Sequence, residues 1–97
     1  MLTQSQKRQL KGLASTSKVK YQIGKAEISD TLLDMLSKAL TAKELIKIDV
    51  MKGYTKPIME LAIDLSVKLN AELIQVVGRV IILFRRNKEK PVIQLVK

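Results

Sequence analysis

The stretch Glu72–Arg85 reads ELIQVVGRVIILFR and holds two short apolar runs with two residues between them. Both runs, Glu72–Val77 and Val80–Arg85, are rich in β-branched residues, which favours strands. The glycine of Gly78-Arg79 suits a two-residue hairpin turn. We therefore predict two antiparallel strands here. The second run contains the longest apolar stretch of the chain, which is far too short to cross a bilayer.

Upstream of the hairpin, two segments alternate apolar and polar residues, as half-buried strands do. Their apolar members are Val19, Tyr21 and Ile23 in one and Ile46, Ile48 and Val50 in the other. Three other segments repeat apolar residues at helical spacing. These positions are Leu10, Leu13 and Ala14, then Ile28, Leu32, Leu36, Ala39 and Leu40, and then Ile58, Leu61, Ala62, Leu65 and Leu69. Strands and helices therefore alternate along the chain.

Cap residues mark the ends of the expected helices. Thr3 and Gln6 fit a capping box for the first helix. Ser29 or Asp30 can cap the second helix, and Thr55 can cap the third, with Pro57 in its first turn and Asn70 after its end. The order α-β-α-β-α-β-β predicts one α/β domain over residues 1–97, a two-layer sandwich with a mixed four-stranded sheet packed by helices. Val92–Val96 is a candidate for one more strand.

The charge of +9 is distributed unevenly along the sequence. Residues 1–25 hold six basic and no acidic residues, and residues 79–97 hold six basic residues and Glu89. The segment between them has more acids than bases. If the two ends meet in the fold, they form one positive face, the usual footprint of a polyanionic partner. The alternative is that dispersed lysines only keep the protein soluble.

The chain has no histidine and no cysteine, so the commonest catalytic bases, thiol nucleophiles and zinc ligands are missing. The carboxylate pairs Asp30 with Asp34 and Glu60 with Asp64 fall on the polar sides of their helices, which indicates solvated faces. We therefore expect no enzyme, no metal and no cofactor. The lack of cysteine and of a secretion signal predicts a cytoplasmic location.

Gly24-Lys25 lies between an expected strand and an expected helix, where backbone N–H groups and the helix dipole can hold an anion. Glycine allows close approach of a phosphodiester, and lysine adds charge. A plain turn is an equally good interpretation of these two residues. The only aromatic residues are Tyr21, Tyr54 and Phe84, and Phe84 is expected in the core. Recognition should therefore depend on phosphates and shape rather than on stacked bases.

Four segments together resemble one family. They are QKRQLKGLA at Gln6–Ala14, IGK at Ile23–Lys25, ALTAKELIKI at Ala39–Ile48 and VVGRVIILFR at Val76–Arg85. In this order they are similar to the YhbY-type proteins, stand-alone bacterial members of the CRM (chloroplast RNA splicing and ribosome maturation) domain family. The resemblance implies an RNA-binding α/β domain, similar in fold to the C-terminal domain of translation initiation factor three. It also implies association with precursor large ribosomal subunits in bacteria and with intron RNA in plants.

In this family the loop after the first strand commonly reads G-K-x-G. Gly24 and Lys25 match its first half, but Glu27 occupies the place of the second glycine. A negative side chain there would repel a phosphate, although it also suits the start of a helix.

The sequence thus predicts a non-enzymatic, monomeric protein that binds ribosomal RNA and needs neither a membrane nor a small-molecule substrate. The predicted RNA contacts are Gly24 and Lys25 in the loop, Arg8 and Lys11 on the first helix, and Lys18, Lys20, Arg85, Arg86 and Lys88. Two alternatives remain open at this point. One is a small architectural DNA-binding protein, and the other is an interaction module for ribosomal or assembly proteins.

Overall fold

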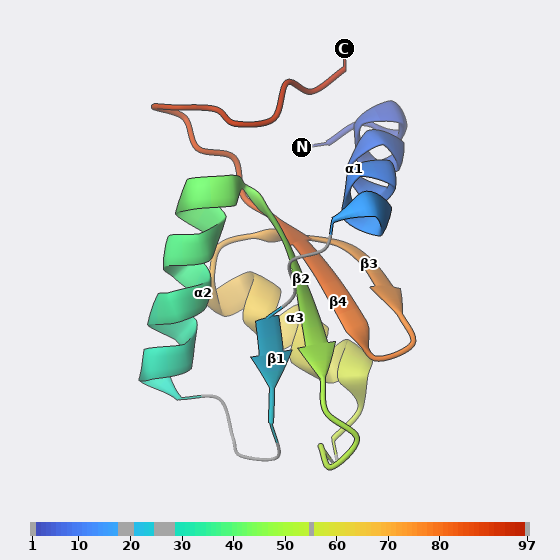
Figure 1. Cartoon of the computed structure of the whole chain (residues 1–97), viewed down its shortest axis with the longest axis vertical. Coiled ribbons are helices and arrows are strands. Elements are labelled where there is room, and N and C mark those ends of the chain that lie inside the picture. Colours follow the sequence, from blue (N-terminus) through green and yellow to red (C-terminus); the bar gives the residue numbers. More distant parts are fainter. Residues whose placement is uncertain (1, 18–20, 25–28, 55, 97) are drawn as a thin grey trace.

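Three helices and four strands follow one another in the predicted order α-β-α-β-α-β-β in the computed structural model (Figure 1). The structure describes residues 2–17, 21–24, 29–54 and 56–96. The elements are α1 (Gln4–Thr16), β1 (Tyr21–Ile23), α2 (Asp30–Lys43), β2 (Leu45–Val50), α3 (Ile58–Lys68), β3 (Glu72–Val77) and β4 (Val80–Phe84). The predicted α/β class is confirmed.

The four strands form one mixed sheet in the order β1-β2-β4-β3. β1 and β2 are parallel, because α2 carries the chain back between them, and β4 is antiparallel to both β2 and β3. Val77 and Val80 are paired across the β3–β4 turn, and Gly78 takes a φ of 58° there, as the predicted hairpin requires. The turn therefore lies beside the carboxyl end of β2.

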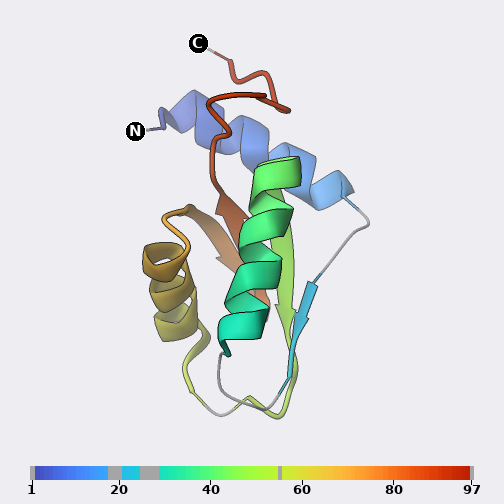
Figure 2. The same ribbon diagram turned by 90° about the vertical axis from the view of Figure 1, so that its left-hand side faces the viewer.

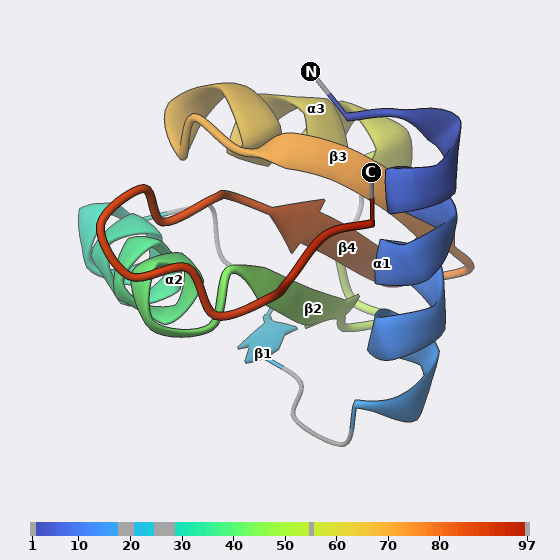
Figure 3. The same cartoon turned by 90° about the horizontal axis from the view of Figure 1, so that it is seen from above.

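One face of the sheet is closed by α2 and α3, and we call it the closed face (Figures 1 and 3). Strand residues such as Ile48 and Leu83 pack there against Leu36 of α2 and Leu65 of α3, and all four are fully buried. This face holds the larger core. At roughly 25 cal/mol per Å² of apolar surface removed from water, such burial supplies the main stabilisation of the fold.

The other face is only partly covered, by α1, and we call it the open face (Figures 2 and 3). Leu10 and Ala14 of α1 pack there on Ile74, Ile82 and Phe84. Strand β4 is thus buried on both sides, which explains its uninterrupted apolar sequence. Phe84 is in the core, as predicted. Helix α1 adds a partial third layer to the two layers formed by the sheet with α2 and α3.

The helix ends follow the cap residues closely. Thr3 and Gln6 form the complete capping box of α1, and the Ser29 side chain accepts the Leu32 N–H at the start of α2. At α3 the N-cap residue is Pro57, without a side-chain hydrogen bond, and Thr55 lies outside the described residues. Asn70, with a φ of 51°, ends α3 as predicted.

The candidate last strand, Val92–Val96, is wrong, because this segment is irregular. Its backbone donors bind side chains instead of a neighbouring strand. The N–H groups of Val92 and Ile93 donate to the Glu44 carboxylate, and that of Val96 donates to the side chain of Gln9. The segment therefore crosses the end of the sheet without joining it.

Candidate nucleic-acid interface

Helix α1 and the C-terminal segment lie side by side at one end of the molecule (Figures 1 and 3). The Gln6 side chain donates to the carbonyl of Val96 at 2.8 Å, and the Gln9 side chain donates to the carbonyl of Gln94 at 2.8 Å. Ile93 and Leu95 pack against the core beneath α1. The two basic ends of the sequence therefore meet, which was the condition for a shared positive surface.

These two segments carry exposed cations, which we call the terminal basic cluster. Its members are Lys7, Arg8 and Lys11 of α1 and Arg86, Lys88 and Lys90 of the C-terminal segment. Within the described ranges, the salt bridges join Lys38 to Asp34 and Lys68 to Asp64, on α2 and α3. Within the same ranges no salt bridge involves a member of the cluster, and only Arg86 lies close enough to a buried carboxylate, that of Glu44, to lower its pKa. Most of the charge of the cluster is therefore available to a ligand. Four of the predicted contact residues, Arg8, Lys11, Arg86 and Lys88, belong to it.

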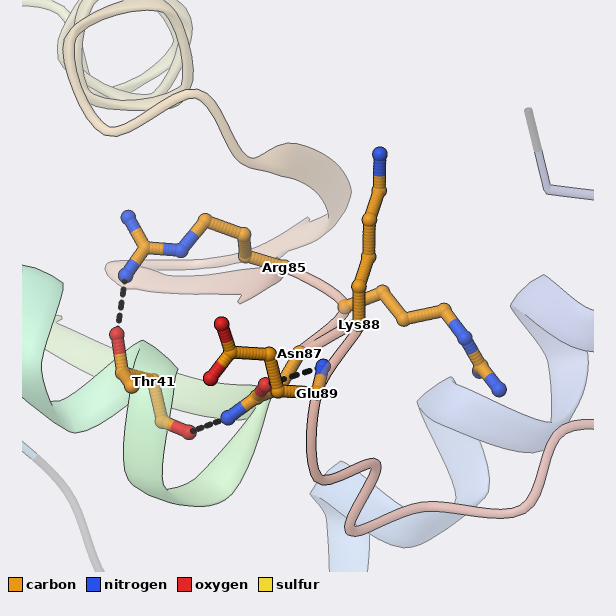
Figure 4. A pocket seen from close by; sticks show the side chains of 6 residues that line it. Thr41, Arg85, Asn87, Lys88 and Glu89 are labelled. Atoms are coloured by element: carbon orange, nitrogen blue, oxygen red, sulfur yellow. Dashed lines mark hydrogen bonds between the residues drawn. The ribbon is translucent and has the colours of Figure 1, made fainter.

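Arg85 is used differently from its neighbours (Figure 4). Its guanidinium donates to the carbonyl of Leu69 at 2.9 Å, to the carbonyl of Ser37 at 2.6 Å and to the hydroxyl of Thr41 at 2.9 Å. Arg85 thereby joins the end of α3 to α2. Lys88 is exposed, and its ammonium group points away from Thr41. The RNA contact predicted for Arg85 stays a prediction, but most of its donors already have protein acceptors.

A surface hollow of about 400 Å³ lies beside Arg85 at the end of α2. It is lined by Thr41, Arg85, Arg86, Asn87, Lys88 and Glu89. The Asn87 side chain donates to the carbonyl of Thr41 and accepts from the N–H groups of Glu89 and Lys90, so it fixes this turn. Glu89 makes the hollow mixed in charge.

Glu44 is a site residue that the sequence reasoning missed. It is fully buried, it has a φ of 66°, and its carboxylate accepts the N–H groups of Asn87 at 2.7 Å, Val92 at 2.7 Å and Ile93 at 2.6 Å. Burial alone would raise its pKa, but these three hydrogen bonds and nearby Arg86 outweigh burial and hold the pKa below its ordinary value. Glu44 therefore fixes the C-terminal segment and the cations on it.

Gly24 lies at the other end of the sheet, where the parallel strands β1 and β2 both end (Figure 1). The N–H of Met51 donates to the carbonyl of Ile23 at 2.9 Å, so the two strand ends are held together. Among the described residues, a Cβ on Gly24 would meet the sulfur of Met51, at 3.8 Å, and the φ of Gly24 is not in the left-handed region. Neither its own φ nor a described neighbour therefore requires glycine at this position. Lys25 and Glu27 lie outside the described residues, as do Lys18 and Lys20.

Arg79 is a second residue whose position the sequence did not reveal. Its side chain donates to the carbonyl of Met51 at 3.3 Å, and its own carbonyl accepts the N–H of Val50 at 2.9 Å. The hairpin turn and the exposed residue Lys52 thus lie at the same end as Gly24. The carboxyl ends of parallel strands in α/β sheets commonly form ligand sites. Arg79 lies at this end of the sheet because the strand order puts β4 beside β2.

The predicted contact residues therefore fall in two places. Arg8 and Lys11 lie on α1, and Arg86 and Lys88 lie beside the end of α2, at the same end of the molecule, whereas Gly24 follows β1 at the far end of the sheet. A six-residue strand such as β2 spans about 17 Å between these ends. A ligand that touches both places must extend along the sheet.

The structure thus defines a small basic α/β domain, and basic residues gathered at one end are typical of proteins that bind polyanions. The chain belongs to the CRS1/YhbY (CRM) domain family, whose model matches residues 2–85. It is 33% identical over 95 residues to the probable RNA-binding protein YqeI of Bacillus subtilis, and the match covers 98% of this chain and 99% of that protein. The family suspected from the sequence is confirmed.

A solved structure shows the same fold. The solution structure of the hypothetical protein SAV1595 from Staphylococcus aureus, described as a candidate RNA binding protein, matches with a TM-score of 0.80 and 38% identity. The match covers 99% of this chain and 100% of that one. Across the described parts of the chain, no helix is long and apolar enough to cross a membrane. The same residues contain no group of three His, Cys, Asp or Glu side chains that could hold a metal ion.

Proposed function

We propose that the protein binds RNA and associates with precursor large ribosomal subunits during ribosome assembly. The observation that carries this proposal is the likeness, over almost the whole chain, to two relatives described as RNA-binding proteins. The protein would act by binding alone, because its sequence offers no histidine or cysteine for catalysis. It would do so in the cytoplasm.

The arrangement of charge supports binding through phosphates. The terminal basic cluster supplies Arg8, Lys11, Arg86 and Lys88, and Gly24 lies at the far end of the sheet, with Lys25 next to it in the sequence. A glycine that no described neighbour requires would let a phosphodiester approach the backbone there. The three aromatic residues support the same mode, because Phe84 is buried and Tyr21 and Tyr54 pack against the core. Phosphates and shape are thus the features that this surface is suited to recognise.

Binding to folded ribosomal RNA should depend steeply on salt. If five cations each neutralise a phosphate, log K falls against log salt with a slope of about −3 to −4, at roughly 0.7 per contact on single strands. We expect Lys11→Gln to make the slope shallower by about 0.7. Lys68→Gln removes the same charge from α3, where Lys68 pairs with Asp64, and should leave the slope unchanged. An affinity that is independent of salt would contradict the proposal.

The DNA-binding alternative is less well supported, because the β3–β4 connection is a tight turn without the long arm that minor-groove bending requires. A filter-binding competition between folded ribosomal RNA and duplex DNA separates the two. Preference for the RNA is expected, and preference for the duplex would favour the architectural protein.

An interaction module remains a second candidate because of one observation on α3. Met59, Ile63 and Val67 recur every fourth residue and are 53%, 52% and 73% exposed, so they form an apolar stripe on the outer side of the helix. If the double reversal Arg8→Glu with Lys11→Glu leaves co-sedimentation with ribosomes unchanged while Ile63→Glu abolishes it, the protein contact would be the main one.

A further inference from the structure

A narrow groove of about 190 Å³ lies on the open face, between α1 and the sheet. It is lined by Lys11, Ala14 and Ser15 of α1, Lys47 of β2, Gln75 and Val77 of β3, and Val80 and Ile82 of β4. The groove forms because α1 crosses the sheet at one end and covers only part of this face. It extends from the helix toward the β3–β4 turn.

The floor of the groove is apolar and accessible. Val77 and Val80 are paired across the turn, so their side chains lie on the same face of the sheet, and Val77 is 52% exposed. Ile82 and Ala14 close the inner end. An exposed valine on an edge strand leaves apolar surface in water, and a flat ring laid over this floor would remove it from water.

The rim of the groove carries polar groups of two kinds. Lys11 and Lys47 supply positive charge. The Lys47 ammonium donates one hydrogen bond to the carbonyl of Ser17 at 3.2 Å, which holds the ammonium group beside the groove. An ammonium group has two further N–H donors, which can bind a ligand. Gln75 is paired with Ile82 in the sheet, and its side-chain amide offers both a donor and an acceptor. No described residue forms a hydrogen bond with this side-chain amide. Asp49 follows Lys47 on the same strand face and disfavours a phosphate on its side.

We propose that this groove holds one unpaired nucleotide of the bound RNA. The base lies on Val77 and Val80, the amide of Gln75 meets the base edge, and the phosphate lies between Lys11 and Lys47. The volume falls below the roughly 300 Å³ at which pockets begin to hold whole drug-sized ligands, so a single base is the fitting occupant. This inference rests on the proposed function, and it adds base contacts to a surface otherwise suited to phosphates.

The test compares two RNA hairpins that differ in one nucleotide. One stem is fully paired, and the other carries a single bulged uridine. We expect the wild-type protein to bind the bulged hairpin about tenfold more tightly, because the base covers apolar surface of Val77 and Val80 that otherwise faces water. Val77→Glu, which places a carboxylate on the groove floor, should abolish this preference. Val67→Glu is the matched control, because Val67 is an exposed valine on α3, outside the groove.

A crosslink provides a readout that does not depend on any variant. With 4-thiouridine at the bulge, irradiation should attach the RNA to residues 11–15, to Lys47 or to residues 75–82. Equal binding of both hairpins by the wild type, a preference that survives Val77→Glu, or crosslinks elsewhere would overturn the groove and leave RNA binding intact. If the wild type binds neither these hairpins nor folded ribosomal RNA, the proposed function fails and the groove fails with it.

Discussion

The two faces of the sheet differ in how completely helices cover them. On the closed face, α2 and α3 bury Leu36, Ile48 and Leu65 completely. On the open face, α1 and the C-terminal segment cover one end and leave Val77 half exposed beside a groove. The difference separates two tasks within one small domain. The closed face supplies most of the stability, and the open face keeps surface free for a ligand.

The largest expected effect tests the closed face. Leu65→Ala leaves a cavity between α3 and the sheet and should lower the free energy of unfolding by about 2–5 kcal/mol. Val77→Ala on the open face should change it by less than about 0.5 kcal/mol. Urea denaturation of both variants measures the contrast. Equal losses would show that stability is shared by the two faces.

The next effect concerns Glu44, which fixes the C-terminal segment to the end of the sheet. Glu44→Gln removes the charge that accepts three backbone N–H groups and should cost about 2–3 kcal/mol near pH 7. Because folding lowers the pKa of Glu44, its contribution is complete above the ordinary pKa near 4.5 and is lost as the pH falls through the folded value.

The difference between wild type and Glu44→Gln should therefore shrink below about pH 4.5. Thermal melts from pH 3 to 7 measure it, with Glu60→Gln on the exposed side of α3 as the control. A difference that stays constant with pH would show that the Glu44 charge does not hold the segment.

The smallest expected effects separate two basic residues of one segment. Arg85→Gln should cost about 1.5 kcal/mol of stability, because its guanidinium bonds to α2 and to the end of α3, with little change in RNA affinity. Lys88→Gln should leave stability unchanged and weaken RNA binding about fourfold at 0.15 M salt, from a slope of about 0.7 per contact. Anisotropy titrations and urea melts measure both. The reverse pattern would make Arg85 a ligand contact.

Local sequence signals predicted much of the fold. The Thr3 capping box, the Ser29 cap, the Gly78 turn and the stop at Asn70 each depend on neighbours within four residues, so the sequence shows them directly. The segregation of basic residues toward both ends of the chain is also visible in the sequence, but only the fold shows that the ends meet.

The missing parts depend on contacts between distant residues. Glu44 binds backbone groups more than 40 residues later, in a segment without regular structure, so no spacing rule announces it. Arg79 reaches Met51 only because β4 lies beside β2, and the groove exists only because α1 stops short of covering the open face. The wrongly predicted strand at Val92–Val96 has the same origin, since Glu44 and Gln9 bind its N–H groups.

The proposed partner of this surface is the ribosomal RNA of an assembling large subunit. Crosslinking the protein to RNA in cells, followed by sequencing of the attached fragments, tests this proposal. We expect reads concentrated in large-subunit ribosomal RNA, with a marked loss when Arg8 and Lys11 are both changed to Glu. Reads spread evenly over messenger RNA, or unchanged in that variant, would contradict it.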